Sequence, residues 1–423
     1  MKQIKVFNPE HDLALANGNR HFIAPKNIRE MACDLAPLLD VMGDEFVVWG
    51  WDGVVKECLR HMGVADSLLP ADAALQALRA CSERQSAHRL LQAFHVDHPG
   101  GPYTGESIIA HDIDEIVAYA LLHGHIVLKD PLSSSGKGLR HVNMDEDGNN
   151  NENTSTKGDE TFALQRSATK SLQSSDRQSS LSSSLKKIVN WANALINRHG
   201  YLTAEPYYNK VQDFAMEFCV NAGQCRFIGY SLFNTNSHGR YESNLLISDE
   251  KIEAQLAQYV GFSALREVQA WVIRHFSRII PAEWDTTLHP LYFGIDMMVV
   301  RNTDNGQLTM DNSGFALHPC VEINLRLNMG IIAHEVRRKL LAPMAEGTFH
   351  VTSFPSGEAA MQFHKEYSEN WPLIYCDGKI SSGYHPLTPI CPHTRHHAYI
   401  WVSSNQSLLL NKIDKGFSEN LFV

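Results

Sequence analysis

Apolar and polar positions alternate in two different rhythms through the first 95 residues. Strand-like runs lie at Ile4 to Phe7 and at Glu45 to Trp49, and helical spacing extends from Gly53 to Met62 and from Ala71 to Cys81. Strands that alternate with helices indicate a small parallel α/β domain at residues 1–95. Its first strand runs into the loop NPEHD, at the sheet edge where ligands often bind, although a capped turn would have the same sequence.

Two more strand-like runs, HIVLKD and GLRHV, are joined by the loop PLSSSGKG, and the composition then changes sharply. Residues 143–184 are mostly Asn, Ser, Asp, Glu, Gln and Thr, with few apolar side chains. Such a segment cannot bury enough surface to offset the entropy lost on ordering. We therefore expect a flexible insertion within one domain, because regular patterns stand on both sides of it.

Regular periodicity returns after residue 184 and continues almost to the end of the chain. Helices are expected from Leu185 to a stop at Gly200, at 251–280 in two pieces around Gly261, and after Gly330. Strands are expected at residues 202–205, 213–219, 225–233, 291–300, 320–324 and 396–402. The predicted fold class is thus mixed, α/β at the N-terminus and α+β beyond it.

Composition and charge describe a soluble globular protein. Hydrophobic residues make up 43% of the chain and charged residues 20%, and no run approaches the length of a membrane span. The net charge of −10 argues against nucleic acid as a partner. The start of the sequence lacks the pattern of a signal peptide, and the eight cysteines form no CxxC pair, so we expect reduced thiols and a cytoplasmic location. A homo-oligomer is left open.

Lys129 and the loop that follows it form the first constellation with chemical meaning. The loop is Ser133, Ser134, Ser135, Gly136, Lys137 and Gly138. Glycines allow a backbone to approach a phosphate closely, and hydroxyl, amide and ammonium groups can donate to its oxygens. The spacing does not match a Walker motif, and a plain Ser/Gly hairpin would have the same sequence.

Two acids in the segment AEPYYNKVQDF form the second constellation. Glu205 ends a short apolar strand, and Asp213 lies eight residues further on. Carboxylates can accept hydrogen bonds from an adenine amino group or from ribose hydroxyls. Two surface carboxylates are the alternative.

The third constellation is the most specific. Asp296 interrupts the apolar run FGIDMMVV, while Glu322 and Asn324 alternate in CVEINLR and so share one face of a strand. If these strands pair across the turn NTDNG, three oxygen ligands converge in a set that suits Mg²⁺. Arg326 continues the alternation and could grip a carboxylate or a phosphate. Buried ion pairs between these acids and Arg326 are the alternative.

A cluster of Cys391, His393, His396 and His397 also suggests a metal site, but its spacing matches no common zinc pattern.

The order of these motifs resembles the ATP-grasp family. VLKDP, SSSGKG, AEPYY, GIDMM and VEINLR follow one another as do the strand lysine, glycine-rich loop, acidic hinge, acidic strand and E-x-N strand of that family. The resemblance covers roughly residues 80–345. It differs in Leu325, where the family usually has proline, and in the long insertion.

The resemblance implies a role for each matching residue. Lys129 would contact the α- and β-phosphates of ATP, and the loop at 133–138 would cover the β- and γ-phosphates. Glu205 would lie at the adenine and Asp213 at the ribose. One or two Mg²⁺ ions would be held by Asp296, Glu322 and Asn324.

For Arg84 and Arg240, only the position relative to the family's motifs implies a role. Arg84 stands where the family usually has a phosphate-binding lysine. Arg240, in SHGRYESNLL, would lie with Arg326 at the phosphate-transfer centre, where positive charge stabilises the transition state. A surface loop arginine is the alternative for Arg240.

The expected fold is an ATP-grasp fold preceded by the small parallel domain. Two lobes, at 96–204 and 205–346, would clasp ATP, and residues 347–423 would form a mixed extension. The expected reaction is a carboxylate–amine ligation through an acylphosphate, with ADP and phosphate released and small molecules as partners. A small-molecule kinase of the same fold and a non-catalytic ATP-binding protein are the alternatives.

Overall fold

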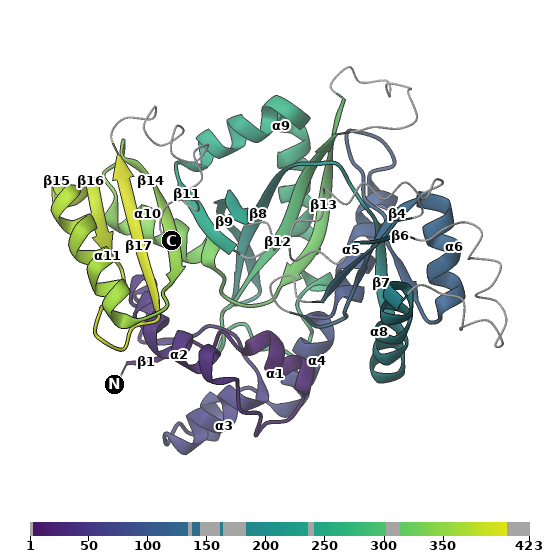
Figure 1. Cartoon of the computed structure of the whole chain (residues 1–423), viewed down its shortest axis with the longest axis horizontal. Coiled ribbons are helices and arrows are strands. Elements are labelled where there is room, and N and C mark those ends of the chain that lie inside the picture. The colour runs from purple at the N-terminus through teal and green to yellow at the C-terminus, as the bar shows by residue number, and fades with distance from the viewer. Residues whose placement is uncertain are drawn as a thin grey trace.

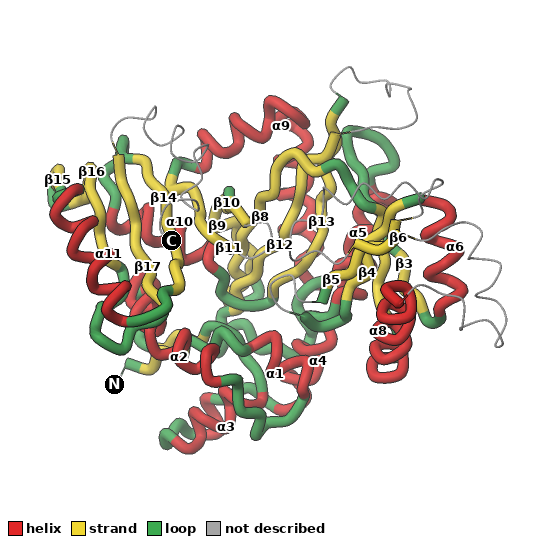
Figure 2. The backbone as a smooth tube through the Cα atoms, viewed as in Figure 1, coloured by secondary structure: helices red, strands yellow, loops and turns green. Residues whose placement is uncertain are grey.

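Three sheets and an N-terminal helical unit make up the molecule. The computed structural model describes residues 3–133, 138–143, 161–163, 183–235, 241–301 and 314–403. The sheets lie side by side across the molecule, and the N-terminal unit lies below them in the view of Figure 1. Figure 2 shows the strands gathered into these three groups, with helices on their outer faces.

The N-terminal unit is built on two parallel strands, as the sequence predicted. β1 (Ile4–Val6) pairs with β2 (Phe46–Val48). Four α-helices and two 3₁₀ helices accompany the pair: α1 (His11–Asn17), α2 (Lys26–Leu35), η1 (Ala36–Met42), α3 (Gly53–His61), η2 (Asp66–Leu68) and α4 (Asp72–Cys81). The loop NPEHD leaves the carboxyl end of β1 and runs directly into α1.

The second group is a five-stranded sheet in the order β3-β7-β4-β5-β6. Its strands are β3 (Ile108–Ala110), β4 (His125–Lys129), β5 (Leu139–Asn143), β6 (Thr161–Ala163) and β7 (Leu202–Pro206). Helices α6 (Ile113–His123) and α8 (Ser183–His199) pack on one face, over a core that includes Ile126 and Leu128. Side chains alternate along HIVLKD, so Ile126 and Leu128 both face this core. Lys129, the last residue of β4, points to the other face of the sheet.

The predicted insertion at 143–184 differs from the structure at its ends and in its middle. Asn143 belongs to β5, and α8 already begins at Ser183. Thr161–Ala163 form β6, which pairs in parallel with β5. Backbone hydrogen bonds at a sheet edge need no alternating apolar pattern, so composition alone did not reveal this strand. Residues 144–160 and 164–182 lie outside the described part of the chain.

The central sheet is antiparallel, in the order β13-β12-β8-β9. Its strands are β8 (Lys210–Asn221), β9 (Gln224–Ser231), β12 (Leu291–Arg301) and β13 (Phe315–Asn324). One face is apolar and packs against α5 (Arg84–Asp97) and α9 (Asp249–His275). Gly261 interrupts α9 with φ 79° and ψ 154°, so this helix consists of two pieces, as predicted. The other face of the sheet carries polar residues.

The third sheet changes the expected division of the chain. Its order is β10-β11-β14-β17-β16-β15. The strands are β10 (Phe233–Thr235), β11 (Tyr241–Leu246), β14 (Glu346–Ser353), β15 (Ile374–Cys376), β16 (Lys379–Pro386) and β17 (His396–Ser403), with helices α10 (Met329–Leu340) and α11 (Gly357–Asn370). The expected boundary at 346/347 falls inside β14, and that at 95/96 falls inside α5. The pairing of β11 with β14 therefore joins the last strands to the preceding lobe.

A second core connects the N-terminal unit to this third sheet. Phe7 and Trp49 from the N-terminal unit pack with Ile332 of α10 and with Phe349 and Ile400 of the sheet. All eight cysteines are free thiols. Among the described helices, none combines the length and apolar character needed to cross a bilayer.

Candidate active site

The three expected metal ligands converge on the polar face of the central sheet. β12 pairs with β13 in a register that places Asp296 directly opposite Glu322, and Gly294 opposite Asn324. This confirms the predicted pairing of the two strands, although the turn NTDNG lies outside the described residues. Asp213 on β8 lies further along the same face, where its Oδ2 accepts from Lys210 Nζ at 2.5 Å.

The electrostatics of this face favour a cation. Burial, and next the facing charge of Glu322, raise the pKa of Asp296 to about 7, although Arg326 and Asn324 oppose the shift. Two carboxylates and an amide oxygen are a hard oxygen donor set. A divalent ion would relieve the repulsion between the two acids, so these residues fit Mg²⁺. Within the described ranges, no group of three His, Cys, Asp or Glu side chains forms a metal site by itself.

Arg326 is held by a residue from the other end of the chain. Its Nε donates to Asp12 Oδ1 at 3.1 Å and its Nη2 to Asp12 Oδ2 at 2.9 Å, and Nη2 also reaches Asn324 Oδ1 at 3.3 Å. Burial would raise the pKa of Asp12, but the charge of Arg326 lowers it overall. Arg326 thus contacts Asn324, but from the bend after β13 and not by the strand alternation expected from the sequence, and its guanidinium binds a carboxylate of the protein itself.

Arg84, the first residue of α5, contacts Glu322, the second of the two facing acids. Its Nη2 lies 3.3 Å from Glu322 Oε1, and its Nε donates to the backbone oxygen of Asp130 at 3.1 Å. The arginine therefore connects the loop after β4 to the acidic strand β13. A cation at this point could neutralise a phosphate next to a bound metal.

Lys129 and Glu205 form an ion pair across β4 and β7. Both side chains are largely buried, at 7% and 12% exposure. The pair lies on the side of the five-stranded sheet that is close to β13 of the central sheet, because the charge of Lys129 acts on His318. Burial, and next that charge, lower the pKa of His318 to about 3. The expected adenine hinge residue is therefore adjacent to the expected phosphate lysine.

The loop after β4 is described only at its ends. Ser134, Ser135, Gly136 and Lys137 lie outside the described residues, as does Arg240. Gly138 closes the loop, because Asp130 N donates to Gly138 O at 2.9 Å. A Cβ on Gly138 would lie 2.3 Å from Ser133 Oγ, so only glycine fits there.

Two groups near the site had not been assigned from the sequence. Glu217 on β8 is 1% exposed, and burial raises its pKa to about 8. Asn328 Nδ2 donates to its Oε2 at 2.7 Å. Glu217 in FAMEF is an acid within an apolar strand, as Asp296 is, and this shared pattern could have identified it from the sequence. His318 is the other, and it carried no signal in the sequence.

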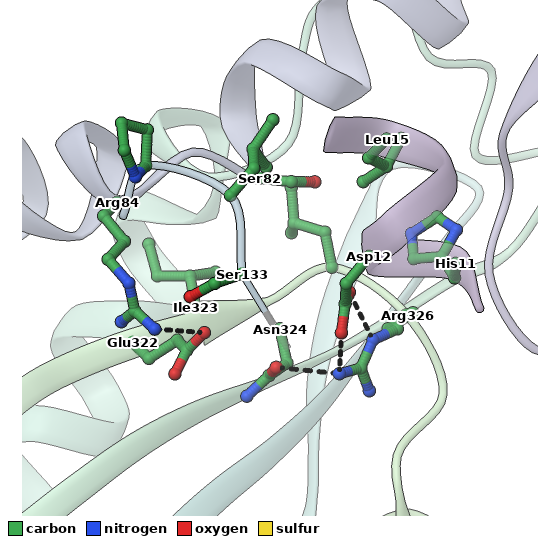
Figure 3. Close-up of a pocket in the computed structure, with 13 residues that line it drawn as sticks. His11, Asp12, Leu15, Ser82, Arg84, Ser133, Glu322, Ile323, Asn324 and Arg326 are labelled. Atoms are coloured by element: carbon green, nitrogen blue, oxygen red, sulfur yellow. Dashed lines mark hydrogen bonds and ion pairs between the residues drawn. The ribbon is translucent and has the colours of Figure 1, made fainter. Parts of the chain in front are cut away.

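A single pocket gathers many of these residues. Its empty volume is about 360 Å³, and its lining includes His11, Asp12, Ser133 and Arg84 together with Glu322–Arg326 of the acidic strand. Figure 3 shows Arg84 and Glu322 at one end, and Asp12 with Arg326 toward the other. The N-terminal unit, the loop after β4 and β13 thus meet at one point.

The cluster near the C-terminus is structural. His397 has both ring nitrogens hydrogen-bonded, to Tyr384 at 2.8 Å and to Thr388 at 2.9 Å. His396 bonds Ser353 at 2.9 Å. His397 therefore has no ring nitrogen left for a metal, and the described residues hold no group of three candidate ligands here.

Comparisons with known proteins give only distant likenesses. No family model matches the sequence, and no curated protein matches it. The chain is similar to N5-carboxyaminoimidazole ribonucleotide synthetase from Thermus thermophilus, at 12% identity over 92% of this chain and 86% of that chain, with a TM-score of 0.42. It is also similar to the L-amino acid ligase from Bacillus licheniformis, at 10% identity over 90% and 82%, with a TM-score of 0.43.

A third solved structure is N5-carboxyaminoimidazole synthetase from Staphylococcus aureus complexed with ADP. The identity is 9% over 79% of this chain and 70% of that chain, with a TM-score of 0.40. Likeness of this degree does not identify a substrate or an activity. The chain's own arrangement places Lys129 and Glu205 on the five-stranded sheet and Asp296, Glu322 and Asn324 on the central sheet.

Proposed function

We propose that this protein is an ATP-dependent ligase that joins a carboxylate to an amine and releases ADP and phosphate. One observation carries the proposal. Asp296, Glu322 and Asn324 converge on one sheet face, and Glu322 and Asn324 line a pocket together with Arg84 and Ser133, the first residue of the Ser/Gly loop. A set of oxygen ligands next to fixed positive charge is what a nucleoside triphosphate with Mg²⁺ requires.

ATP would lie between the five-stranded sheet and the central sheet. Glu205 would accept from the adenine amino group, Asp213 would bind the ribose, and Lys129 would move from its ion pair with Glu205 to the α- and β-phosphates. The loop residues Ser134 to Lys137, with Gly138, would cover the β- and γ-phosphates. The placement is supported by the position of the Lys129–Glu205 pair, since a buried cation and a buried acid side by side can bind a phosphate and an amino group once the ligand replaces their mutual contact.

Asp296, Glu322 and Asn324 would hold one or two Mg²⁺ ions. When bound, the metal supplies positive charge that lowers the repulsion between the triphosphate and an incoming carboxylate. Arg84 adds charge on the same side of the pocket. Arg240 would assist at the phosphate-transfer centre, and Arg326 would act there while it remains anchored to Asp12.

The expected chemistry has two steps. A carboxylate oxygen of the first substrate attacks the γ-phosphorus, and the bond to the bridging oxygen breaks with its electron pair on ADP. The amine of the second substrate then attacks the acylphosphate carbonyl carbon, and the C–O bond breaks with its electron pair on phosphate. The chain need only bind, orient and neutralise, because neither step uses a covalent nucleophile of the protein.

The test is an ADP-release screen against pools of amino acids and other carboxylic acids, followed by product identification. The proposal predicts ADP release that requires both a carboxylate and an amine. A phosphorylated product would identify a small-molecule kinase instead. ATP binding without ADP release under any of these conditions would identify a non-catalytic binding protein.

A further inference from the structure

A histidine and an aspartate of the N-terminal unit form a pair at the same pocket. His11 lines the pocket together with Glu322 and Asn324, but it comes from the NPEHD loop. In Figure 3 His11 lies at the end of the pocket away from Arg84 and Glu322, on the first turn of α1. The proposed phosphate chemistry uses the Arg84 end, so the His11 end borders the space left for the second substrate.

The imidazole of His11 is held from one side by a fixed carboxylate. Its Nδ1 lies 3.0 Å from Asp52 Oδ2, and the two side chains are 2% and 3% exposed. Asp52 is itself fixed, since its Oδ2 accepts from Asn8 Nδ2 at 3.1 Å and its Oδ1 from Val55 N at 2.9 Å. A carboxylate anchored in this way orients the ring and sets which nitrogen carries the proton.

Packing against Gly50 also fixes the position of the imidazole ring. Gly50 lies directly under it, and a Cβ at Gly50 would lie 2.5 Å from His11 Cγ and 2.6 Å from Nδ1. Asn8 holds the same glycine, with its Nδ2 donating to Gly50 O at 2.9 Å and its Oδ1 accepting from Gly50 N at 3.1 Å. Asn8 of the loop and Gly50, which follows β2, therefore fix the imidazole in place.

The second ring nitrogen is the one left for a ligand. The carboxylate of Asp52 can only accept, so Nδ1 carries the proton and Nε2 has a free lone pair. No residue in the described ranges hydrogen-bonds Nε2. An oriented imidazole with an unused acceptor nitrogen is the arrangement of a general base.

We infer that His11 is the base that deprotonates the acceptor amine, and that Asp52 is its positioning residue; this rests on the ligase function proposed above. The amine arrives as an ammonium ion at neutral pH. His11 Nε2 takes one proton, and the neutral nitrogen attacks the acylphosphate carbonyl carbon. The C–O bond to phosphate breaks, and a second proton passes from nitrogen to the leaving phosphate, which departs as HPO₄²⁻.

The test compares two nucleophiles on the same acylphosphate. Hydroxylamine is uncharged at neutral pH and needs no base, whereas an amino acid does. The His11→Gln enzyme should form hydroxamate from ATP, the carboxylate pool and hydroxylamine within about threefold of wild type. Its amide formation with the twenty amino acids as acceptors should fall by about 10²-fold or more.

Asp52→Asn should show the same split with a smaller loss, because it disturbs the proton position and not the base itself. His21→Gln, at an exposed histidine of the same unit, is the matched control and should change neither rate. Equal loss of both products in a folded His11→Gln protein, or loss of neither, would overturn the assignment. Absence of hydroxamate with wild type would instead count against the proposed ligase.

A second measurement needs no substrate. In ¹⁵N-histidine NMR of the wild-type protein at pH 8.5, the His11 signals, identified by their absence in His11→Gln, should show the proton on Nδ1 and none on Nε2. Gly50→Ala should shift those signals, because the added methyl group would displace the imidazole ring. A proton on Nε2 in the wild-type protein would overturn the assignment even if the ligase function stands.

Discussion

At the scale of single residues, the site is defined by two acids that face each other. Asp296 and Glu322 lie opposite one another on neighbouring strands, and the charge of Glu322 adds to the burial that raises the pKa of Asp296. Like charges directly across a sheet destabilise it. Such a pair is retained at a cost to stability, which is expected where function requires both acids.

Glu322→Ala should therefore separate function from stability. We expect ADP release to fall by about 10²–10³-fold, because a metal ligand near the transferred phosphate is lost. The free energy of unfolding should stay the same or rise by about 1 kcal/mol, because the repulsion is relieved. Coupled-enzyme assays and urea denaturation measure the two effects.

Glu369→Ala serves as the control, because Glu369 is an exposed acid near the end of α11. It should leave both quantities within experimental error. An active Glu322→Ala enzyme would remove Glu322 from the metal site.

At the scale of elements, strand alternation explains what the sequence could predict. The alternation in VEINLR placed Glu322 and Asn324 on one face, which the register with β12 confirms, but the strand ends at Asn324, and Arg326 reaches Asn324 from the bend that follows. Partners far apart in sequence could not be predicted. Asp12 meets Arg326 across 314 positions, because a local pattern does not indicate which other element it will contact. The pairing of β11 with β14 was not predicted, for the same reason.

The Asp12–Arg326 pair should measurably connect α1 to the end of β13. Its side chains are 23% and 18% exposed, so water screens the pair only in part. A double-mutant cycle with Asp12→Ala and Arg326→Ala should give a coupling energy of about 1–3 kcal/mol in urea unfolding.

The same cycle on Lys26 and Glu30 is the control. That pair lies 3.6 Å apart within α2, with 84% and 41% exposure, and should give less than about 0.5 kcal/mol. Equal coupling in the two pairs would mean that the bidentate contact adds nothing beyond a surface ion pair.

Glu217 should make stability depend on pH, since it joins β8 to Asn328, the N-cap residue of α10. Burial raises its pKa from an ordinary 4.5 to about 8, against the hydrogen bond from Asn328. The folded protein then keeps a proton that the unfolded chain releases above pH 4.5. The contribution is complete below pH 4.5 and is lost as the pH rises through 8.

Glu217→Gln should remove this loss. Between pH 5 and 8 the free energy of unfolding of wild type should fall relative to the variant by on the order of a few kcal/mol. Exposed Glu366 gives the control, Glu366→Gln, which should retain the wild-type slope. Parallel pH profiles of wild type and Glu217→Gln would show that Glu217 is ionised in the folded state.

At the scale of the whole molecule, the site lies where separate units meet. The five-stranded sheet supplies Lys129 and Glu205, the central sheet supplies the proposed metal ligands, and the N-terminal unit supplies His11 and Asp12. Figure 1 shows these three units around the centre of the molecule. A ligand bound there contacts several units at once and so stabilises their arrangement.

Mg-ATP should accordingly raise the melting temperature of the whole protein. At 100 times its dissociation constant, a ligand of the folded state adds about 2.7 kcal/mol to the free energy of unfolding. Differential scanning fluorimetry should show the increase with ATP and Mg²⁺, and a smaller one with ATP and EDTA. An unchanged melting temperature with saturating Mg-ATP would contradict nucleotide binding.

The core shared by the two ends of the chain has a consequence for biosynthesis. Phe7, Leu35 and Trp49 are covered by Phe349 and Ile400, which the ribosome adds roughly 350 residues later. At about 5–20 residues per second, these side chains wait roughly 20–70 s for their partners. The nascent N-terminal unit therefore exposes an apolar surface throughout synthesis, and chaperones that bind such surfaces have that whole interval in which to act.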